Sequence, residues 1–374
     1  MKVLIDGRSL VKRPTGIATY TICIIQAISK YLSDWELVVA MPQEMHDSIN
    51  DFPKSRVRLI VEPLFGYRKM PRFIWYHLKF PFIAKKENAD IIWGVNAEMP
   101  ILKFGRVKRM ITVHDVVWKE YPETMHRSAK FVSIPFLNYS INNADLIICN
   151  SRYTISKVEH YYQNRRCRKM VGVDSCSTIF RKINISDRDK LLFLDKYKLT
   201  KRFILFVGSL EPRKNLTFLL KIMPEIYKKT GAKLLVVGGT KWKNSSINNL
   251  ITGDRNIRES VVFADFVSFT ELVTIYNLAT CYVSTSLNEG FGMPQLEAMS
   301  CGCPVISPHN SAMIEVVEGR GITVKGWDNK EWIDVIVRTL NDEKLLKKLS
   351  NPDISEYKWD VLASKIDKYI KAGL

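Results

Sequence analysis

Short apolar runs alternate along the chain with longer amphipathic stretches. In the first half, the apolar runs occupy residues 2–6, 36–41, 57–61, 90–95, 109–115 and 145–150. Hydrophobic residues at helical spacing occupy residues 17–30, 71–86, 128–143 and 151–162. Runs that are apolar throughout, separated by amphipathic helices, are typical of parallel strands with both faces covered.

The alternation restarts after a polar, charged stretch at residues 183–202. Strands are predicted at residues 202–208, 233–239, 260–266, 280–286 and 304–307, and helices at 216–229, 271–278 and from residue 294 onward. We therefore expect an α/β chain with two doubly wound, Rossmann-like domains, residues 1–185 and 186–356, facing one another across a cleft. A C-terminal helix, residues 357–374, is expected to pack back toward the first domain. Ligands of such sheets bind beyond the carboxyl ends of the strands.

Composition indicates a folded protein with a basic surface. Hydrophobic residues make up 46% and charged residues 25% of the 374 positions, which excludes a disordered polycation. The net charge is +18, and the excess is uneven: residues 1–187 carry 29 Lys and Arg against 17 Asp and Glu, the remainder 27 against 21. Most of the surplus therefore lies in the first half.

Cysteine usage and the N-terminal sequence indicate a cytoplasmic protein. The seven cysteines are scattered, mostly within apolar runs, which is typical of reduced core residues. Cys301 and Cys303 have no second Cys or His pair at zinc-ligand spacing, so no metal site is expected there. The opening sequence MKVLIDGRSL is unlike a signal peptide, and no apolar stretch approaches the roughly 20 residues that span a bilayer.

A glycine turn with two cations follows the predicted strand at residues 202–208. Gly208 and Ser209 are followed by Arg213 and Lys214, and a helix begins near Asn215. A diphosphate needs a close backbone approach, cations and the positive end of a helix, and this segment offers all three. A solvated cationic turn is the alternative.

A second candidate site lies at residues 286–297, SLNEGFGMPQLE. Gly290 and Gly292 free the loop backbone, and Pro294 suits the first turn of a helix. Glu289 in the loop and Glu297 on the helix can both accept hydrogen bonds from ligand hydroxyls. Alternatively, Glu289 is an exposed loop acid and Glu297 only complements the helix dipole.

Together these motifs resemble the family 4 retaining glycosyltransferases. The pair Glu289 and Glu297, with the following GCPVI, resembles the family's E-x7-E signature, and GSLEPRKN resembles its phosphate-binding turn. Further matches, in chain order, are Asp6-Gly7-Arg8, Thr15-Gly16-Ile17-x-x-Tyr20, Val113-His114-Asp115, Asn150-Ser151, Val262-Phe263, Val267-Ser268, Glu271-Leu272 and Tyr276. The resemblance covers nearly the whole chain.

The resemblance implies a GT-B enzyme that moves a sugar from a nucleotide diphosphate donor to an acceptor with retention. Glu297 would accept ribose hydroxyls, Glu289 would contact the transferring sugar, and Lys214 with Arg213 would hold the diphosphate. The implied donor-binding residues are Gly16, Ile17, Gly208, Ser209, Phe263, Asn288, Gly290, Phe291 and Gly292. His114 would approach the sugar, although a strand-end histidine with satisfied hydrogen bonds is the alternative.

One departure from the family pattern concerns the phosphate turn. Many members have Arg directly after the turn glycine, where this chain has Ser209. Arg213 is the candidate for the missing cation, whereas Lys214 stands at the position of the family's lysine. The resemblance favours same-face attack, in which the departing phosphate takes the acceptor proton, over a covalent intermediate on Glu289. Asp187-Arg188-Asp189 is a nominal DxD in the presumed linker, and we interpret it as chance, so neither metal nor cofactor is expected.

Basic and aromatic residues are interleaved at residues 66–86, GYRKMPRFIWYHLKFPFIAKK. This pattern suits a helix lying on an anionic membrane, where each Lys or Arg contributes ~1 kcal/mol. It equally suits an ordinary helix whose aromatic residues face the sheet, and Pro81 is expected to break it.

The chain is therefore expected to add a hexose from a donor such as GDP-mannose to a lipid-linked glycan during synthesis of O-antigen, capsule or exopolysaccharide. Its expected place is the inner face of the cytoplasmic membrane. Two alternatives stay open. One is another nucleotide-sugar enzyme of this fold, an epimerase or phosphorylase. The other is a nucleic-acid-binding protein. Two observations disfavour it: the positive charge is dispersed along the chain, and the sequence contains no recognised nucleic-acid-binding motif.

Overall fold

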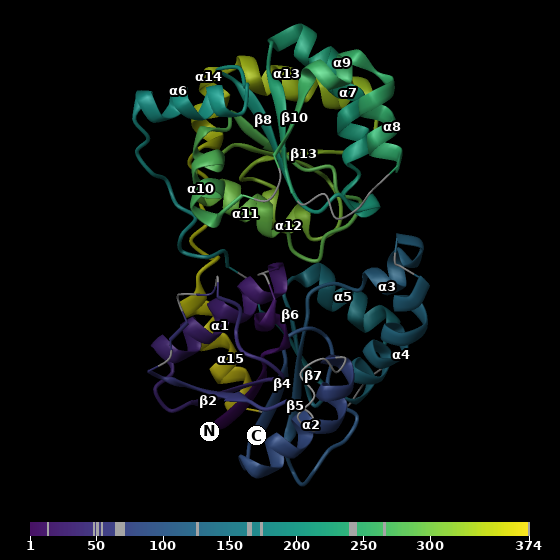
Figure 1. Ribbon diagram of the computed structural model, residues 1–374, viewed down its shortest axis with the longest axis vertical. Helices are drawn as coiled ribbons and strands as arrows, with labels where there is room; N and C mark the ends of the chain where they lie inside the picture. The colour runs from purple at the N-terminus through teal and green to yellow at the C-terminus, as the bar shows by residue number, and fades with distance from the viewer. Residues whose placement is uncertain are drawn as a thin grey trace. The chain divides into compact units, whose positions relative to one another are not determined.

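The computed structural model consists of two compact units, Met1–Ser175 with Glu356–Leu374, and Cys176–Ser355 (Figure 1). It describes all residues except 13–14, 48, 50–51, 54, 64–71, 125–126, 163–166, 173–174, 239–244, 265–266 and 373–374; in two helices the side chains of residues 127–132 and 245–246 are also outside the description. In the described part, no helix is long and apolar enough to cross a membrane.

The first unit is built on a parallel sheet in the order β3-β2-β1-β4-β5-β6-β7. Its strands are β1 (Lys2–Asp6), β2 (Glu36–Met41), β3 (Val57–Val61), β4 (Ile91–Gly94), β5 (Lys108–Val113), β6 (Leu146–Cys149) and β7 (Arg168–Val171). Its helices are η1 (Arg8–Val11), α1 (Gly16–Tyr31), α2 (Arg72–Lys86), α3 (Val117–Glu120), η2 (Pro122–Thr124), α4 (Arg127–Asn143), α5 (Arg152–Tyr161) and α15 (Trp359–Lys371).

The second unit repeats this plan with six parallel strands in the order β10-β9-β8-β11-β12-β13. The strands are β8 (Phe203–Val207), β9 (Lys233–Val237), β10 (Val261–Ala264), β11 (Cys281–Val283), β12 (Val305–Pro308) and β13 (Ile322–Val324). The helices are α6 (Asp187–Lys196), η3 (Pro212–Lys214), α7 (Leu216–Thr230), α8 (Ser245–Gly253), α9 (Arg255–Ser260), α10 (Phe269–Leu278), α11 (Met293–Ser300), α12 (Met313–Val317), α13 (Asn329–Asn341) and α14 (Glu343–Leu349). The predicted fold class, two doubly wound α/β sheets, is confirmed.

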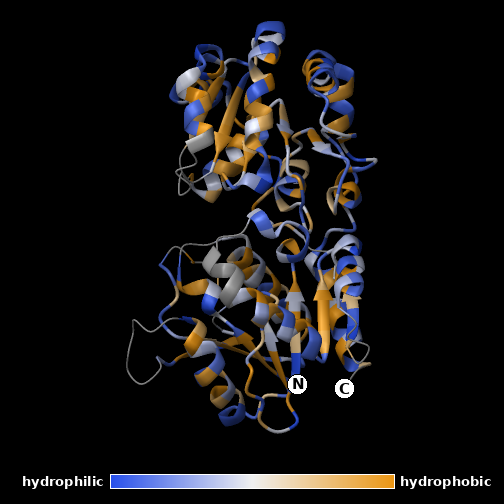
Figure 2. Ribbon diagram, turned by 90° about the vertical axis from the view of Figure 1, so that its right-hand side faces the viewer, coloured by the Kyte–Doolittle hydropathy of each residue, from blue (hydrophilic) through white to orange (hydrophobic). Residues whose placement is uncertain are grey.

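The C-terminal helix α15 belongs to the first unit, where it packs against α1. Leu362, Ile366 and Ile370 are fully buried in the same hydrophobic cluster as Ile24 and Ile28 of α1. The side chains of both helices thus extend the core of the first sheet, and hydrophobic residues occur in its strands as well as in the helices that cover it (Figure 2).

Two expectations about the boundary between the units are corrected. The chain passes to the second unit at residue 176 rather than 186, because Cys176 already hydrogen bonds to Ser300 (3.1 Å) and the Ile183 amide donates to Asn277 (2.9 Å). The presumed linker also holds α6, which begins where the Ser186 side chain accepts a hydrogen bond from the Asp189 amide (3.1 Å). Asp187 and Asp189 are therefore helical residues of the second unit, at the favourable positive end of α6.

Helix α2 corrects a third expectation, because it continues through Pro81. A proline inside a helix costs roughly 3 kcal/mol. Here, burial of Trp75, Tyr76 and Phe80, each at most 1% exposed, offsets that cost. These aromatic residues face the sheet, as the second interpretation of residues 66–86 proposed. Arg68 and Lys69, two of its basic residues, lie outside the described residues.

Candidate active site

Two loops leave neighbouring strands at the carboxyl edge of the second sheet. Strand β8 leads into residues 208–215 and α7, and β11 leads into residues 284–292 and α11. Because β8 pairs with β11 where the strand order reverses, both loops emerge at the switch point of a doubly wound sheet. The end of β9 passes close by: a side chain at Gly238 would lie 1.9 Å from the Gly208 carbonyl oxygen, so only glycine fits there.

Backbone hydrogen bonds join the two loops. The Leu287 amide donates to the Arg213 carbonyl (2.8 Å), and the Thr285 hydroxyl donates to the carbonyls of Lys214 (3.0 Å) and Asn215 (3.1 Å). Asn215 adopts a left-handed conformation (φ 49°) between η3 and α7, which Asn tolerates better than most residues. These contacts fix the backbone from which both cations project.

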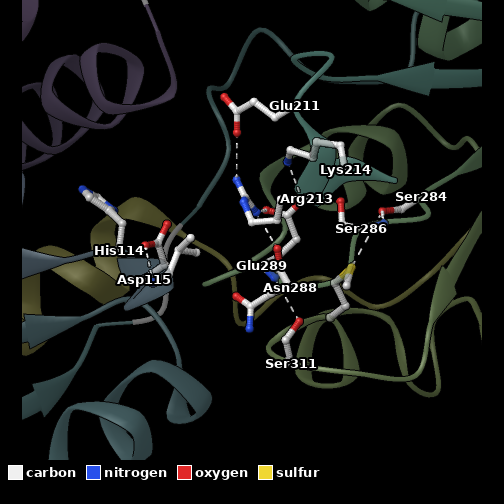
Figure 3. A network of polar contacts seen from close by, with 12 residues as sticks. His114, Asp115, Glu211, Arg213, Lys214, Ser284, Ser286, Asn288, Glu289 and Ser311 are labelled. Carbon is white, nitrogen blue, oxygen red and sulfur yellow. Dashed lines mark hydrogen bonds and ion pairs between the residues drawn. The ribbon is translucent and has the colours of Figure 1, made fainter. Parts of the chain in front are cut away.

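Glu289 is the centre of a buried ionic cluster (Figure 3). One carboxylate oxygen accepts from Lys214 Nζ and from the Ser286 hydroxyl (2.7 Å). The other accepts from Arg213 Nη1 at 3.1 Å. The Glu289 amide donates to Ser311 Oγ (3.0 Å), which fixes the backbone beneath the carboxylate.

The electrostatics of this cluster follow from burial and charge. Burial by itself would raise the pKa of Glu289, but the positive charges of Lys214 and Arg213 outweigh it and lower the pKa to about 2. Glu289 is therefore ionised at neutral pH and neutralises part of the charge of two largely buried cations, whose side chains are 12% and 14% exposed. The alternative interpretation of Glu289 as an exposed loop acid is wrong, since only 8% of the residue is exposed.

Helix α11 positions the second carboxylate of the predicted signature. Gly292 precedes the helix with φ 114°, a conformation that favours glycine. Glu297 lies in the middle of α11, where Tyr276 donates a hydrogen bond to it at 3.0 Å. Burial raises the pKa of Glu297 to about 8, against the lowering effect of the Tyr276 hydrogen bond. Two carboxylates of one motif thus differ in charge near neutral pH.

The remaining predicted residues of the second unit occupy three places. Gly208 and Ser209 form the turn after β8, and Asn288, Gly290 and Phe291 lie in the buried loop around Glu289. Phe263 is separate from this group: it lies on β10, two strands from β8, and is 36% exposed. It lines a hollow of about 420 Å³ with Lys196, Tyr197, Lys198, Val262, Ala264, Val267 and Glu271.

The first unit carries the other three predicted residues. Gly16 and Ile17 are the first residues of α1. His114 follows β5, and its Nε2 donates to the Val95 carbonyl at 2.8 Å. Burial lowers the pKa of His114, so the ring is neutral and Nδ1 carries the lone pair. Asp115 accepts from the Val117 amide (3.1 Å) at the start of α3, which is a structural role.

Sequence reasoning overlooked the hydroxyl groups that position these carboxylates. Ser286 lies three residues before Glu289, so the spacing of a local side-chain contact was present in the motif. Ser311 comes from the loop after β12 and gave no local signal. Tyr276 was matched by resemblance alone, without its hydrogen bond to Glu297.

Two family descriptions match the chain, one in each half. Residues 14–171 match "Glycosyltransferase Family 4" and residues 201–342 match "Glycosyl transferases group 1". Together these matches cover most of both units. No group of three or more metal-ligating side chains occurs among the described residues.

Curated relatives and a solved structure agree with these matches. The chain is 28% identical over 266 residues to O-antigen chain mannosyltransferase B of Escherichia coli, covering 70% of this chain and 68% of the relative. It is 26% identical over 325 residues to O-antigen chain mannosyltransferase RfbU of Salmonella typhimurium, covering 86% and 82%. The fold matches that of Anabaena HepE, solved in complex with UDP-glucose, with a TM-score of 0.74, 17% identity and full coverage of both chains. With the E-x7-E carboxylates and the cationic turn assembled at one sheet edge, the chain belongs to the family 4 glycosyltransferases of the GT-B fold.

Proposed function

We propose that this glycosyltransferase transfers a hexose from a nucleotide diphosphate sugar to a glycan acceptor, with retention, in the synthesis of a bacterial surface polysaccharide. The observation that carries the proposal is the pair of largely buried cations, Arg213 and Lys214, beside the loop that opens α11. The O-antigen mannosyltransferases among the relatives support mannose, carried by a donor such as GDP-mannose. HepE, solved with UDP-glucose, supports a nucleotide sugar as the donor class.

Stabilisation of the leaving diphosphate is the main catalytic requirement. Negative charge grows on the phosphate oxygens as the sugar departs, and Lys214 and Arg213 can neutralise it. Each donor of this kind is worth roughly 3 kcal/mol in an enclosed site. Backbone amides of Gly290, Phe291 and Gly292 complete the proposed set.

Retention is proposed to occur by same-face attack, in which the departing phosphate accepts the proton of the acceptor hydroxyl. Glu289 is engaged with two cations and Ser286, which suits orientation of the sugar better than nucleophilic attack. Trapping a covalent glycosyl adduct on Glu289 would contradict this mechanism.

His114 is proposed to contact the donor sugar through Nδ1, because Nε2 is already engaged by Val95. The His114→Ala variant should then turn over more slowly at saturating donor. Unchanged turnover would assign His114 to strand-end packing alone.

We propose that transfer needs no metal ion. Asp187 and Asp189 belong to the first turn of α6, where the Ser186 hydroxyl also donates to Asp189 Oδ2 (2.6 Å). Activity should survive EDTA and the double change Asp187→Asn, Asp189→Asn. Loss of activity in EDTA with recovery on adding Mg²⁺ or Mn²⁺ would refute metal independence.

A thermal-shift panel tests the donor class directly. A nucleotide diphosphate present at 100 times its dissociation constant stabilises the folded protein by ~2.7 kcal/mol. GDP and GDP-mannose are expected to raise the unfolding midpoint more than UDP, ADP or their sugars. Product analysis with an acceptor then separates transfer from epimerisation, because an epimerase or phosphorylase would change the donor without forming a glycosylated acceptor.

We also propose that the acceptor is lipid-linked and that the enzyme works at the inner face of the cytoplasmic membrane. The support is the surplus of positive charge in residues 1–187, which the diphosphate site in the second unit does not use. A nucleic acid is not proposed as a partner.

A further inference from the structure

Helix α2 is apolar on two opposite faces. Its inner face packs Trp75, Tyr76 and Phe80 into the cluster that covers β1, β2 and β4. Its outer face carries exposed hydrophobic residues at every fourth position: Ile74 (39% exposed), Leu78 (44%) and Phe82 (54%). Residues four apart form one line along a helix, and a helix that is apolar all round is normally buried on all sides. The outer face of α2 therefore presents a line of hydrophobic residues to water, beside the exposed or partly exposed cations Lys79, Lys85 and Lys86 of the same helix.

The loop after β4 extends this apolar surface. Phe104 packs against Phe82 with ring centroids 4.8 Å apart, and the Ile101 amide donates to His77 Nδ1 at 3.3 Å. Ile101 and Leu102 are 43% and 39% exposed. We call the outer face of α2 together with residues 101–104 the apolar patch.

Cations border the apolar patch. Lys85 and Lys86 are exposed in the last turn of α2, and Lys85 Nζ lies 5.5 Å from the Phe104 ring centroid. Lys86 Nζ also lies 3.4 Å from a carboxylate oxygen of Glu62, but its side chain is 72% exposed. Beside this ring is a hollow of about 390 Å³ whose lining includes Lys85, Arg106 and Lys108. One acid, Asp90, also lines it, and its carboxylate accepts from the Lys2 amide at 2.7 Å. The hollow therefore has an excess of positive charge next to an apolar surface.

We propose that the apolar patch and its bordering cations dock this enzyme onto an anionic phospholipid bilayer. The apolar patch would enter the boundary between headgroups and acyl chains, and Lys85, Lys86 and Arg106 would meet lipid phosphates. A purely anionic partner such as a nucleic acid would use the cations but leave the hydrophobic line exposed to water. The inference rests on the proposed membrane-bound acceptor and names the surface that reaches the membrane.

Vesicle sedimentation of the full chain tests the proposal. The wild type should bind equimolar phosphatidylglycerol and phosphatidylcholine vesicles, and pure phosphatidylcholine vesicles only weakly. The triple change Ile74→Ser, Leu78→Ser, Phe82→Ser should lower the partition coefficient at least about tenfold. The matched control is Leu191→Ser, Leu192→Ser on α6 of the other unit. These two side chains are more exposed than those of the apolar patch (67% and 59%), yet their loss should change binding less than about twofold.

The contribution of charge is tested with lysine pairs at equivalent helical positions. Lys85→Glu, Lys86→Glu should reduce binding to anionic vesicles about tenfold or more. The control Lys228→Glu, Lys229→Glu makes the same change in the last turn of α7. If both pairs reduce binding equally, net charge alone attracts the protein and the proposed surface is wrong.

A labelled variant reports insertion directly. All seven native cysteines are buried, so Leu78→Cys offers an accessible thiol for an environment-sensitive fluorophore, with Leu191→Cys as control. Anionic vesicles should shift the emission of the label at position 78 to the blue and leave the label at 191 unchanged. No shift at 78, or equal shifts at both, would overturn the proposal.

Other outcomes are also decisive. Self-association without vesicles that disappears in the triple variant would assign the patch to a second copy of the chain and overturn docking to lipid. Donor binding, followed by the GDP-mannose thermal shift, should be unchanged in all patch variants. If no nucleotide shifts the unfolding midpoint of the wild type, the proposed function is refuted. Vesicle binding is measured without nucleotide, so it tests the docking surface separately.

Discussion

Replacing Glu289 by Gln keeps the shape of the side chain and removes the charge that Lys214 and Arg213 share. Both cations are largely buried, with side chains 12% and 14% exposed, so Lys214 loses its carboxylate partner without gaining water and Arg213 keeps only the more exposed Glu211 at 3.7 Å. Removing one partner from a buried ion pair costs about 3–5 kcal/mol. The lowered pKa of Glu289 gives a similar free energy. A decrease from 4.5 to about 2 corresponds to about 3 kcal/mol, because a change of one in pKa is worth ~1.4 kcal/mol. For a unit of this size the loss should lower the unfolding midpoint by roughly 6–12 °C.

The pH dependence gives this prediction a direction. Because folding lowers the pKa of Glu289, the stabilisation is complete above 4.5 and is lost as pH falls from 4.5 toward about 2. Unfolding midpoints of wild type and Glu289→Gln should therefore differ most at neutral pH and converge in acid. Glu225→Gln is the control, since it neutralises a Glu whose ion pair with Lys229 lies on the surface, and its midpoint should match wild type.

Anion binding supplies an independent readout. With Glu289 neutralised, the two cations need a counter-ion, so pyrophosphate should bind the Gln variant more tightly than wild type and restore part of the lost stability. Titration calorimetry with pyrophosphate measures this. A variant as stable as wild type at neutral pH, or one with weaker pyrophosphate binding, would show that Glu289 does not compensate these cations.

Three further predictions concern α11 and its neighbours. Burial raises the pKa of Glu297 to about 8, so the free energy of unfolding should fall as pH rises from 4.5 to 8. Glu297→Gln should remove this pH dependence of the unfolding midpoint, and an unchanged pH dependence would contradict the prediction. Tyr276→Phe deletes the hydroxyl that lowers this pKa, so the pH profile of donor binding should move to higher pH, whereas a purely structural Tyr276 would leave the profile in place. The buried amide of Gln295 has no hydrogen-bond partner among the described residues, so Gln295→Leu should raise the free energy of unfolding by about 1 kcal/mol in urea titrations, and destabilisation would indicate an unseen partner.

The strands were predictable because they are buried on both faces and read as continuous apolar runs. Helix α6 was missed for the opposite reason: Phe193 is buried, but Leu191 and Leu192 are 67% and 59% exposed, so its apolar residues form no single stripe. The local effect of Pro81, a lost hydrogen bond and a steric clash, predicts a break in α2. The packing of Trp75 beneath the helix is a tertiary effect that no local pattern contains.

The candidate site was predictable to the extent that it is local in sequence. The turn at Gly208 and the Glu289 loop each carry their own motif, and parallel topology brings the ends of β8 and β11 to one edge. The motifs could not predict that Glu289 forms an ion pair with Lys214. That contact joins segments 75 positions apart and depends on the charge balance of the folded site.

We propose that this contact links the two proposed tasks of the site, diphosphate binding and sugar orientation. Glu289 is the buried counter-ion of Lys214 and Arg213, and Arg213 has a further, more exposed partner in Glu211 at 3.7 Å. Glu289 thereby lowers the cost of burying the two cations. A diphosphate carries more negative charge than one carboxylate, so it can replace Glu289 at both cations. The displaced carboxylate stays beside them, anchored through its backbone amide to Ser311, and is then free to accept hydroxyl hydrogen bonds. We therefore expect diphosphate binding and sugar orientation to be coupled through one side chain, so that a nucleotide diphosphate without a sugar leaves Glu289 both displaced and unpaired.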